Sequence, residues 1–249
     1  MGKIIAFANQ KGGVAKTTST FNVATSLAAR GLRVLMIDLD SQASLTISAG
    51  LEPYECERSI VNVLKKENSN IEDAVVSLTL NLDIVPSRLE LAQLEMEMIG
   101  RSMRETILRR ALASVKNKYD YILIDCPPQL AILTLNALSA ADEVVIPVKA
   151  DYLAYRGVEL LMETIEGVKA LINPSLTVLG IIVTMYEKRS SDDKDVLEVL
   201  QEQYNVLGIV KKTVAVKKGI YDGLSVVQTD PKSDAAQEYN KIADGIVHS

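Results

Sequence analysis

The sequence predicts an α/β fold in which helices cover both faces of a mostly parallel, doubly wound sheet. Short apolar runs alternate with longer amphipathic segments, and each run is nearly continuous in apolar residues, as strands buried on both faces are. The chain has 249 residues, of which 48% are hydrophobic and 24% charged, and this composition excludes disordered and low-complexity chains. We find no linker and no internal repeat, so residues 1–249 are expected to form one domain.

The apolar runs are the expected central strands. In chain order they are Ile4–Ala8, Val34–Ile37, Leu82–Val85, Tyr121–Ile124, Val144–Val148 and Val178–Val183. The amphipathic segments between them are the expected helices. These are Lys16–Arg30, ended by Gly31, then Arg88–Val115 as one long helix or a pair, Gln129–Ala141, Ala154–Ile172, Asp192–Gln203 and Ser233–Val247. The stretch Glu52–Asn81 shows no clear period and predicts no element.

A glycine-containing loop lies between the first strand and the first helix, where folds of this kind bind phosphate. It reads Asn9-Gln10-Lys11-Gly12-Gly13-Val14-Ala15-Lys16-Thr17-Thr18. Glycines let backbone N–H groups converge on an anion, and the N-terminus of the following helix adds positive potential. Lys16 is then expected to reach the β- and γ-phosphates, and Thr17 to offer its hydroxyl to Mg²⁺. The sequence therefore predicts a P-loop NTPase.

The loop departs from the strict P-loop pattern, which has glycine where this chain has Gln10 and Ala15. It fits instead the deviant form K-G-G-x-x-K-T, with an additional lysine at position 11. If the backbone at position 15 requires a positive φ, alanine there costs about 1 kcal/mol or more. We expect the loop to tolerate this alanine and to bind ATP.

Carboxylates follow two other predicted strands. Asp38 and Asp40 follow Val34–Ile37, and Asp125 follows Tyr121–Ile124. The carboxyl ends of neighbouring parallel strands meet at one edge of the sheet, beside the loop. Carboxylates at that edge can hold a magnesium-bound water and orient the water that attacks the γ-phosphate.

Taken together, these motifs resemble the ParA/MinD family of deviant Walker-A ATPases, most closely the short ParA (Soj-type) partition proteins, nearly end to end. Residues 34–42 resemble the first switch of the family, although Ser41 stands where the family usually has proline. Asp125-Cys126-Pro127-Pro128 resembles the Walker-B motif and second switch. Residues 140–148 resemble the strand that follows, and residues 229–239 the closing helix.

The resemblance implies a role for each matching position. Lys11 would reach across a dimer interface to the partner's phosphates, Asp40 would position the hydrolytic water, and Asp125 would hold magnesium through water, with Asp38 a less defined metal ligand. The residues expected to bind the nucleotide are Gly12, Gly13, Val14, Ala15, Lys16, Thr17 and Thr18.

In the resembled family, ATP drives a sandwich dimer that binds DNA without sequence preference. A centromere-binding, ParB-like partner stimulates hydrolysis and so releases the DNA. The resemblance thus implies ATP and Mg²⁺ as cofactors, a homodimer, DNA and a ParB-like protein as partners, and weak basal ATPase activity. The preference for ATP over GTP rests on the resemblance alone.

DNA binding by this chain requires a local basic cluster, because the net charge is −5. The expected DNA-binding residues are Lys188, Arg189, Lys211, Lys212, Lys217 and Lys218. A third basic group comprises Arg101, Arg104, Arg109, Arg110, Lys116 and Lys118. Any one of these clusters is about equally well explained as a solvated face.

The sequence favours a cytoplasmic, nucleoid-associated protein without membrane contact. Cys56 and Cys126 form neither a disulfide framework nor a zinc pattern. The tail after Lys241 lacks the basic amphipathic face of a lipid-binding helix. Two alternatives remain open: an ATPase of the same fold that positions a non-DNA cargo or a membrane complex, and a nucleotide-gated scaffold in which Ala15 and Ser41 have removed useful turnover.

Overall fold

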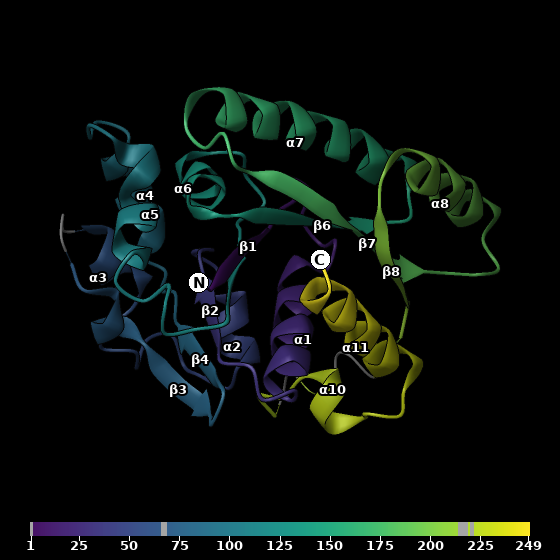
Figure 1. Cartoon of the computed structure of the whole chain (residues 1–249), viewed down its shortest axis with the longest axis horizontal. Coiled ribbons are helices and arrows are strands. Elements are labelled where there is room, and N and C mark those ends of the chain that lie inside the picture. The colour runs from purple at the N-terminus through teal and green to yellow at the C-terminus, as the bar shows by residue number, and fades with distance from the viewer. Residues whose placement is uncertain (1, 66–68, 214–218, 220–221) are drawn as a thin grey trace.

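An eight-stranded sheet runs through the centre of the molecule (Figure 1). The computed structural model describes residues 2–65, 69–213, 219 and 222–249. The strands are β1 (Lys3–Phe7), β2 (Val34–Asp38), β3 (Val76–Thr79), β4 (Leu82–Val85), β5 (Tyr121–Asp125), β6 (Glu143–Lys149), β7 (Thr177–Tyr186) and β8 (Val206–Lys211). Their order in the sheet is β3-β4-β2-β5-β1-β6-β7-β8. Among these described strands, β3 alone runs antiparallel to its neighbour.

All six predicted strands are confirmed, and they form the interior of the sheet. The two strands that sequence reasoning missed, β3 and β8, are the two edges. Residues of β3 alternate between partly buried and exposed, so this strand has no continuous apolar run. In β8 the run is interrupted by Gly208, a residue that strands disfavour. A Cβ at Gly208 would lie 2.6 Å from a side-chain carbon of Ile242, so glycine there allows a helix to approach the strand closely.

Helices cover both faces of the sheet and enclose one apolar core on each (Figure 1). One face carries α1 (Lys16–Ala28), α2 (Ser44–Ser48), α10 (Val226–Thr229) and α11 (Asp234–Val247). The other carries α3 (Ile60–Lys65), α4 (Leu91–Met98), α5 (Ile107–Leu112), α6 (Ile132–Ala140), α7 (Tyr152–Leu171) and α8 (Ser191–Gln203), with the 3₁₀ turns η1 (Ile71–Ala74) and η2 (Arg104–Thr106). The doubly wound architecture is therefore confirmed.

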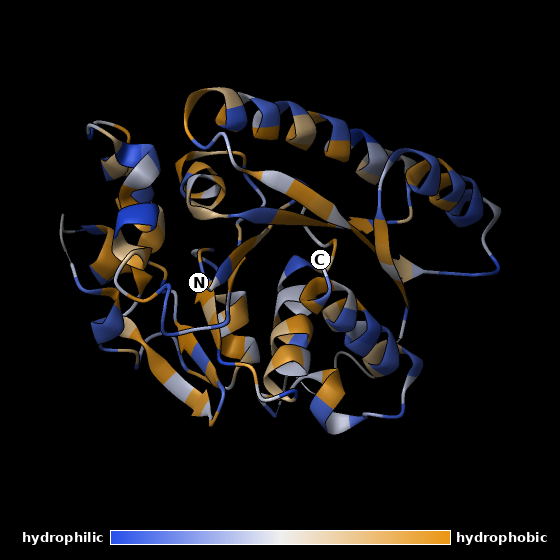
Figure 2. Cartoon of the chain, viewed as in Figure 1, coloured by the Kyte–Doolittle hydropathy of each residue, from blue (hydrophilic) through white to orange (hydrophobic). Residues whose placement is uncertain are grey.

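The amphipathic pattern locates the long helices within a few residues. Figure 2 shows hydrophilic and hydrophobic stripes along α7, α8 and α11, as expected for helices that pack on a sheet. The predicted segment Arg88–Val115 is divided into α4 and α5 rather than forming one helix. Gly100 lies in the break, and Met103 has a positive φ of 53°, a conformation that no right-handed helix continues through. No helix in the described part of the chain combines the length and apolarity needed to cross a membrane.

The parallel arrangement brings distant segments to one edge of the sheet. Asp125 at the end of β5 pairs in register with Phe7 of β1 on one side and with Asp38 of β2 on the other. Further along, Lys149 of β6 pairs with Thr184 of β7, and Tyr186 with Lys211 of β8. The loops that leave the carboxyl ends of β1, β2, β5, β6, β7 and β8 therefore share this edge.

Candidate nucleotide site

The loop between β1 and α1 leads into a helix whose first-turn N–H groups have no partner within the helix. Gly13 and Ala15 have positive φ angles of 73° and 61°, and helix α1 begins directly after Ala15. Among the described residues, no side chain caps the N-terminus of α1. The first-turn N–H groups of a helix have no intrahelical partner, and together with the helix dipole they attract an anion. The backbone here thus fits a phosphate group.

Two neighbouring strands hold this loop in place. Asn9 is buried; its Nδ2 donates to the carbonyl oxygen of Pro147 at 2.8 Å, and its Oδ1 accepts from the backbone N–H of Lys11 at 2.9 Å. From β7, the Thr184 hydroxyl donates to the carbonyl oxygen of Val14 at 3.0 Å. The loop is therefore tied to β6 and β7, which are rigid central elements.

Lys16 is buried at the start of α1, with 7% of its surface exposed. Its Nζ donates to the carbonyl oxygen of Lys11 at 3.2 Å, so the side chain folds back over the loop. Burial lowers the pKa of Lys16, while the attraction of Asp125 opposes that shift. An ammonium beside the N-terminus of a helix is suited to a polyphosphate.

Thr17 and Asp125 are in direct contact. The Thr17 hydroxyl donates to Oδ2 of Asp125 at 2.6 Å, and Asp125 is 1% exposed. Burial and the neighbouring charge of Asp38 raise the pKa of Asp125, and the Thr17 hydrogen bond and Lys16 oppose this. Burial and the neighbouring carboxylates destabilise the ionised form of Asp125. A bound cation would stabilise that form.

Asp38 is fully buried, and its oxygens are already occupied. Its Oδ2 accepts from the backbone N–H and the hydroxyl of Thr46, at 2.8 and 2.7 Å, and its Oδ1 accepts from the N–H of Asp40 at 3.2 Å. Burial raises its pKa to about 6, against which the Thr46 hydrogen bonds act. In this conformation Asp38 organises the segment after β2, and it is Asp40 that lies partly exposed, with its Oδ1 accepting from the N–H of Gln42 at 2.9 Å.

The donor set fits Mg²⁺. Thr17 and Asp125 supply a hydroxyl and a carboxylate, the hard oxygen ligands that this ion prefers. In the described residues no group of three or more His, Cys, Asp or Glu side chains is placed to hold a metal ion. Mg²⁺ does not need such a cage, because it is commonly held by one or two carboxylates together with substrate phosphates.

Lys11 points toward its own chain. Its Nζ lies 2.7 Å from Oδ1 of Asp151, which follows β6. The other carboxylate oxygen of Asp151 lies 3.3 Å from Nζ of Lys149. The contact that the resemblance implies for Lys11, across a dimer interface, requires this side chain to leave Asp151.

Four of the basic residues expected to contact DNA, Lys188, Arg189, Lys211 and Lys212, lie at the same edge, on the far side of β6 from β1. Lys188 and Arg189 follow β7 and are exposed, and the described residues include no acidic partner for either. Lys211 pairs with Asp234 and Lys212 with Glu187. A pocket of about 590 Å³ is lined by Tyr186, Glu187, Lys188, Arg189, Lys211, Lys212 and Thr213. Lys217 and Lys218 lie outside the described residues.

The third basic group is largely engaged within the protein. Arg101 donates to the carbonyl oxygens of Leu64 and Lys65, and Arg109 to that of Ile172. Three other members form ion pairs with described residues: Arg104 with Glu105, Lys116 with Asp142 and Lys118 with Glu72. These cations are therefore less available to an external anion than Lys188 and Arg189.

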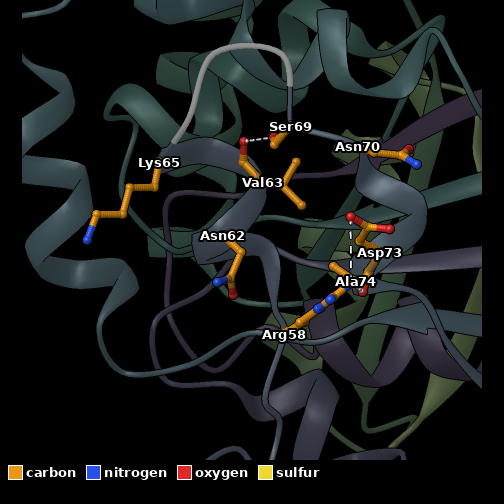
Figure 3. Close-up of a pocket in the computed structure, with 8 residues that line it drawn as sticks. All are labelled: Arg58, Asn62, Val63, Lys65, Ser69, Asn70, Asp73 and Ala74. Carbon is orange, nitrogen blue, oxygen red and sulfur yellow. Dashed lines mark hydrogen bonds and ion pairs between the residues drawn. The ribbon is translucent and has the colours of Figure 1, made fainter.

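A second cavity, of about 320 Å³, lies away from the loop, between α3 and η1 (Figure 3). Its polar lining includes Arg58, which lies 3.6 Å from Asp73, and Ser69, which donates to the carbonyl oxygen of Val63. These polar groups therefore already have partners within the protein.

Sequence reasoning did not single out Asn9, Thr184 or Asp151. Asp151 follows the predicted strand Val144–Val148 by three residues, so the strand-end argument used for Asp38 and Asp125 applies equally to it. Thr184 carried no such signal, because it lies inside a strand and its partner is 170 residues away.

The chain is similar to known proteins over its whole length. A sequence profile for an AAA domain matches residues 2–178. The sporulation initiation inhibitor protein Soj of Bacillus subtilis is 37% identical over 247 residues, 98% of this chain and 97% of Soj. The chromosome partitioning protein ParA of Caulobacter vibrioides is 35% identical over 250 residues, 98% of this chain and 94% of that protein.

Among solved structures, cobyrinic acid a,c-diamide synthase from Mycobacterium smegmatis, with bound ADP and magnesium, superposes with a TM-score of 0.86. The two sequences are 34% identical, and the match covers all of this chain and 95% of the other. The same enzyme was also solved with an ATP analogue and magnesium.

Proposed function

Because this chain belongs to the ParA/MinD family of P-loop ATPases, we propose that it is a DNA partition ATPase. In this proposal residues 1–249 form one ATPase domain, and ATP with Mg²⁺ drives a homodimer that binds DNA without sequence preference. A centromere-binding, ParB-like partner stimulates hydrolysis and releases the DNA. The protein would thereby associate with the nucleoid.

The loop residues 12–18 and the side chain of Lys16 bind the phosphates in this proposal. The uncapped N–H groups of α1 and the buried ammonium supply positive charge without reorganising, since the loop is already tied to β6 and β7. Thr17, and Asp125 through a bound water, would hold Mg²⁺, which when bound would neutralise charge that develops on the β- and γ-phosphate oxygens.

Asp40 orients the attacking water. It is partly exposed at the end of β2, and its Oδ2 has no hydrogen-bond partner among the side chains and backbone that the structure describes. Hydrolysis forms a bond from the water oxygen to the γ-phosphorus and breaks the bond to the β,γ-bridging oxygen. Catalysis here is mainly positioning, which is consistent with slow basal turnover.

The observation that best supports DNA binding is the exposed pair Lys188 and Arg189 at the carboxyl edge of the sheet. Both cations lack an acidic partner in the described part of the chain, so a phosphate would displace only solvent and counterions. This edge also carries the nucleotide loop, which offers a direct route from nucleotide state to DNA affinity. Soj and ParA, to which the chain is similar along its length, carry names that refer to sporulation control and chromosome partitioning.

The test is retention of DNA on a filter, measured with ATP, with ADP and without nucleotide across a salt series. We expect binding with ATP that weakens steeply with salt. The double variant Lys188→Gln/Arg189→Gln should lower the log–log salt slope by about 0.9 for each lost phosphate contact, or roughly 2 per protomer. The control is Arg33→Gln/Lys169→Gln, which removes the same charge before β2 and near the end of α7, outside the three basic clusters.

DNA binding that ignores the nucleotide, or that both double variants reduce equally, would contradict the proposal. Absence of binding at low salt would instead favour an ATPase that positions a non-DNA cargo. Turnover measured with Mg²⁺, DNA and the ParB-like partner then separates either ATPase from a scaffold without useful hydrolysis.

A further inference from the structure

A cavity of about 340 Å³ lies at the amino edge of the sheet. Its walls come from the starts of β1 and β6, from the ends of α5 and α6, and from the turn between α7 and β7. The nucleotide loop lies at the carboxyl edge, and the five residues of β1 that separate the two edges span about 16 Å. The cavity is therefore a separate place from the nucleotide site.

One wall of the cavity is held by Asn173, which is buried in the turn after α7. Its Nδ2 donates to the carbonyl oxygens of Leu138 and Ala141, at 3.0 and 2.7 Å, and its Oδ1 accepts from the hydroxyl of Ser175 at 2.9 Å. The first two bonds use carbonyl groups at the end of α6, where a helix leaves them without an intrahelical partner. This wall is thus fixed before any ligand enters, and its acceptors already hold donors.

The acidic group of the cavity is also engaged within the protein. Among the described residues that line the cavity, Asp142 is the one acid. Its Oδ2 accepts from the backbone N–H of Ile4 at 2.8 Å, and Nζ of Lys116 donates to both carboxylate oxygens at 2.9 Å. The carboxylate is therefore satisfied by its own chain.

The hydrogen-bonding groups that remain are donors. Arg109 is exposed on α5; its Nη1 donates to the carbonyl oxygen of Ile172 at 3.2 Å, and the described part of the chain gives it no other hydrogen bond or ion pair. A guanidinium has five N–H groups and an ammonium has three, so Arg109 keeps four donors and Lys116 keeps one. Two cations against one carboxylate also leave the lining with an excess of positive charge.

Ser139, on α6, lines the cavity as well, and its hydroxyl is buried without a partner. The residue is 1% exposed, and its Oγ forms no hydrogen bond with any described residue. A hydroxyl in this state is unfavourable, because it has lost water without gaining a partner in the protein. An oxygen atom of a bound ligand would supply that partner.

We propose that this cavity binds a small oxyanion, a carboxylate or a phosphate, among Arg109, Lys116 and Ser139. The free donors, the unpartnered hydroxyl and the excess positive charge all require a ligand that brings acceptor oxygens and negative charge. A guanidinium pairs with either anion through two parallel hydrogen bonds. The volume is at the lower end of the range for ligand pockets, so a small ion fits it best.

The test is a titration with sodium phosphate and, separately, with sodium acetate, followed by proton–nitrogen NMR spectra. The protein carries Mg²⁺ and ADP, so that the nucleotide loop is filled, and sodium chloride at the same ionic strength is the control for salt. We expect saturable shifts of the backbone N–H signal of Ser139 and of the side-chain amide of Asn173. A response to phosphate alone identifies a phosphate site, and a response to acetate alone identifies a carboxylate site.

Two variants test the contacts. Arg109→Gln should weaken binding about tenfold or more, because hydrogen bonds from a charged group are lost. Arg110→Gln is the matched control, since Arg110 is the neighbouring exposed arginine and does not line the cavity. It removes the same charge but should change the affinity by less than about twofold.

The second variant is Ser139→Ala, which should weaken binding about 2- to 10-fold. Without the ion, this variant should be at least as thermally stable as the wild-type protein, because it removes a buried hydroxyl that has no partner. The same substitution is thus expected to weaken binding without weakening the fold.

Three results would overturn the proposal. The first is the absence of saturable shifts with both probes. The second is an equal loss of affinity in Arg109→Gln and Arg110→Gln, which would indicate long-range attraction rather than contact. The third is full affinity in Ser139→Ala, which would place the ion outside this cavity. None of these measurements involves ATP hydrolysis or DNA, so their outcome is separate from that of the proposed function.

Discussion

Ala15 stands where the phosphate loop needs a left-handed backbone, and Ala15→Gly should therefore stabilise the protein. Its φ and ψ are 61° and 35°, in the left-handed helical region. For an L-residue this conformation costs about 1–2 kcal/mol, whereas glycine adopts it freely. Glycine also adds conformational freedom to the unfolded chain, and this lowers the free energy of unfolding by about 0.4–1 kcal/mol. The net expected gain is about 0.5–1 kcal/mol in the free energy of unfolding.

The assay is urea unfolding without nucleotide, with thermal unfolding as a second measure. For a chain of this size, 1 kcal/mol shifts the melting temperature by about 2–4 °C. Ala29→Gly is the matched control, because Ala29 follows the other end of α1 in a right-handed conformation, with φ −64° and ψ −19°. Glycine there should destabilise by about 0.5–1 kcal/mol. The same substitution is thus expected to have opposite signs at the two ends of one helix.

A second alanine extends the test. Ala43, before α2, has φ 51° and ψ 33°, so Ala43→Gly should also stabilise. Calorimetry with the ATP analogue should show that Ala15→Gly changes affinity little, because the backbone N–H groups that face the phosphates are present in both proteins. If Ala15→Gly destabilises as much as Ala29→Gly does, the strain argument is wrong. The sequence predicts that the loop tolerates Ala15 and binds ATP. If the wild-type protein does not bind ATP, that prediction is wrong.

Three other substitutions test contacts around the site. Thr184→Val removes the hydroxyl that donates to Val14 and leaves a buried carbonyl oxygen unsatisfied, so urea unfolding should show a loss of about 1–3 kcal/mol. Asp38 has a pKa of about 6 when folded, above its ordinary value of 3.8, so the folded state binds this proton more tightly and loses stability as pH rises from about 4 to 6. Asp38→Asn removes this titration, so the unfolding free energy of the magnesium-free variant relative to wild type should rise by up to about 3 kcal/mol between pH 4 and pH 7. A Cβ at Gly223 would meet Cα of Gly50 at 2.6 Å at a φ of 66°, so Gly223→Ala should destabilise by more than about 1 kcal/mol.

Each of these expectations has a clear contrary result. An unchanged Thr184→Val variant would mean that β7 does not hold the loop. A difference in unfolding free energy between Asp38→Asn and wild type that is equal at pH 4 and pH 7 would mean that the carboxylate of Asp38 does not carry this pH dependence. A tolerated Gly223→Ala would mean that the segment after residue 222 does not approach Gly50 closely.

Much of the interior of the fold could be predicted because its signals are local. A strand buried on both faces needs a continuous apolar run, and Tyr121–Ile124 or Val144–Val148 shows this without reference to any other segment. The edges could not be predicted in this way. Strand β3 lies half in solvent, and β8 contains Gly208, whose reason is the approach of α11 from another part of the chain.

Some features of the nucleotide loop could likewise be predicted from the sequence, and others could not. Its glycines and lysines are adjacent in the sequence, so their order alone indicates a phosphate site between a strand and a helix. That Ala15 adopts a positive φ, that Lys11 contacts Asp151 140 residues away, and that Thr184 holds Val14 are properties of the folded chain.

The sequence by itself determined the fold class, the central strands and the phosphate loop, because these depend on apolar periodicity and on residues that are neighbours in the chain. The tertiary structure decided which charges face one another. Asp38 and Asp125 lie in register because β2 and β5 are adjacent in the sheet, and the order of strands is set by the packing of the whole chain. Contacts between distant residues depend on that order, so no local pattern contains them.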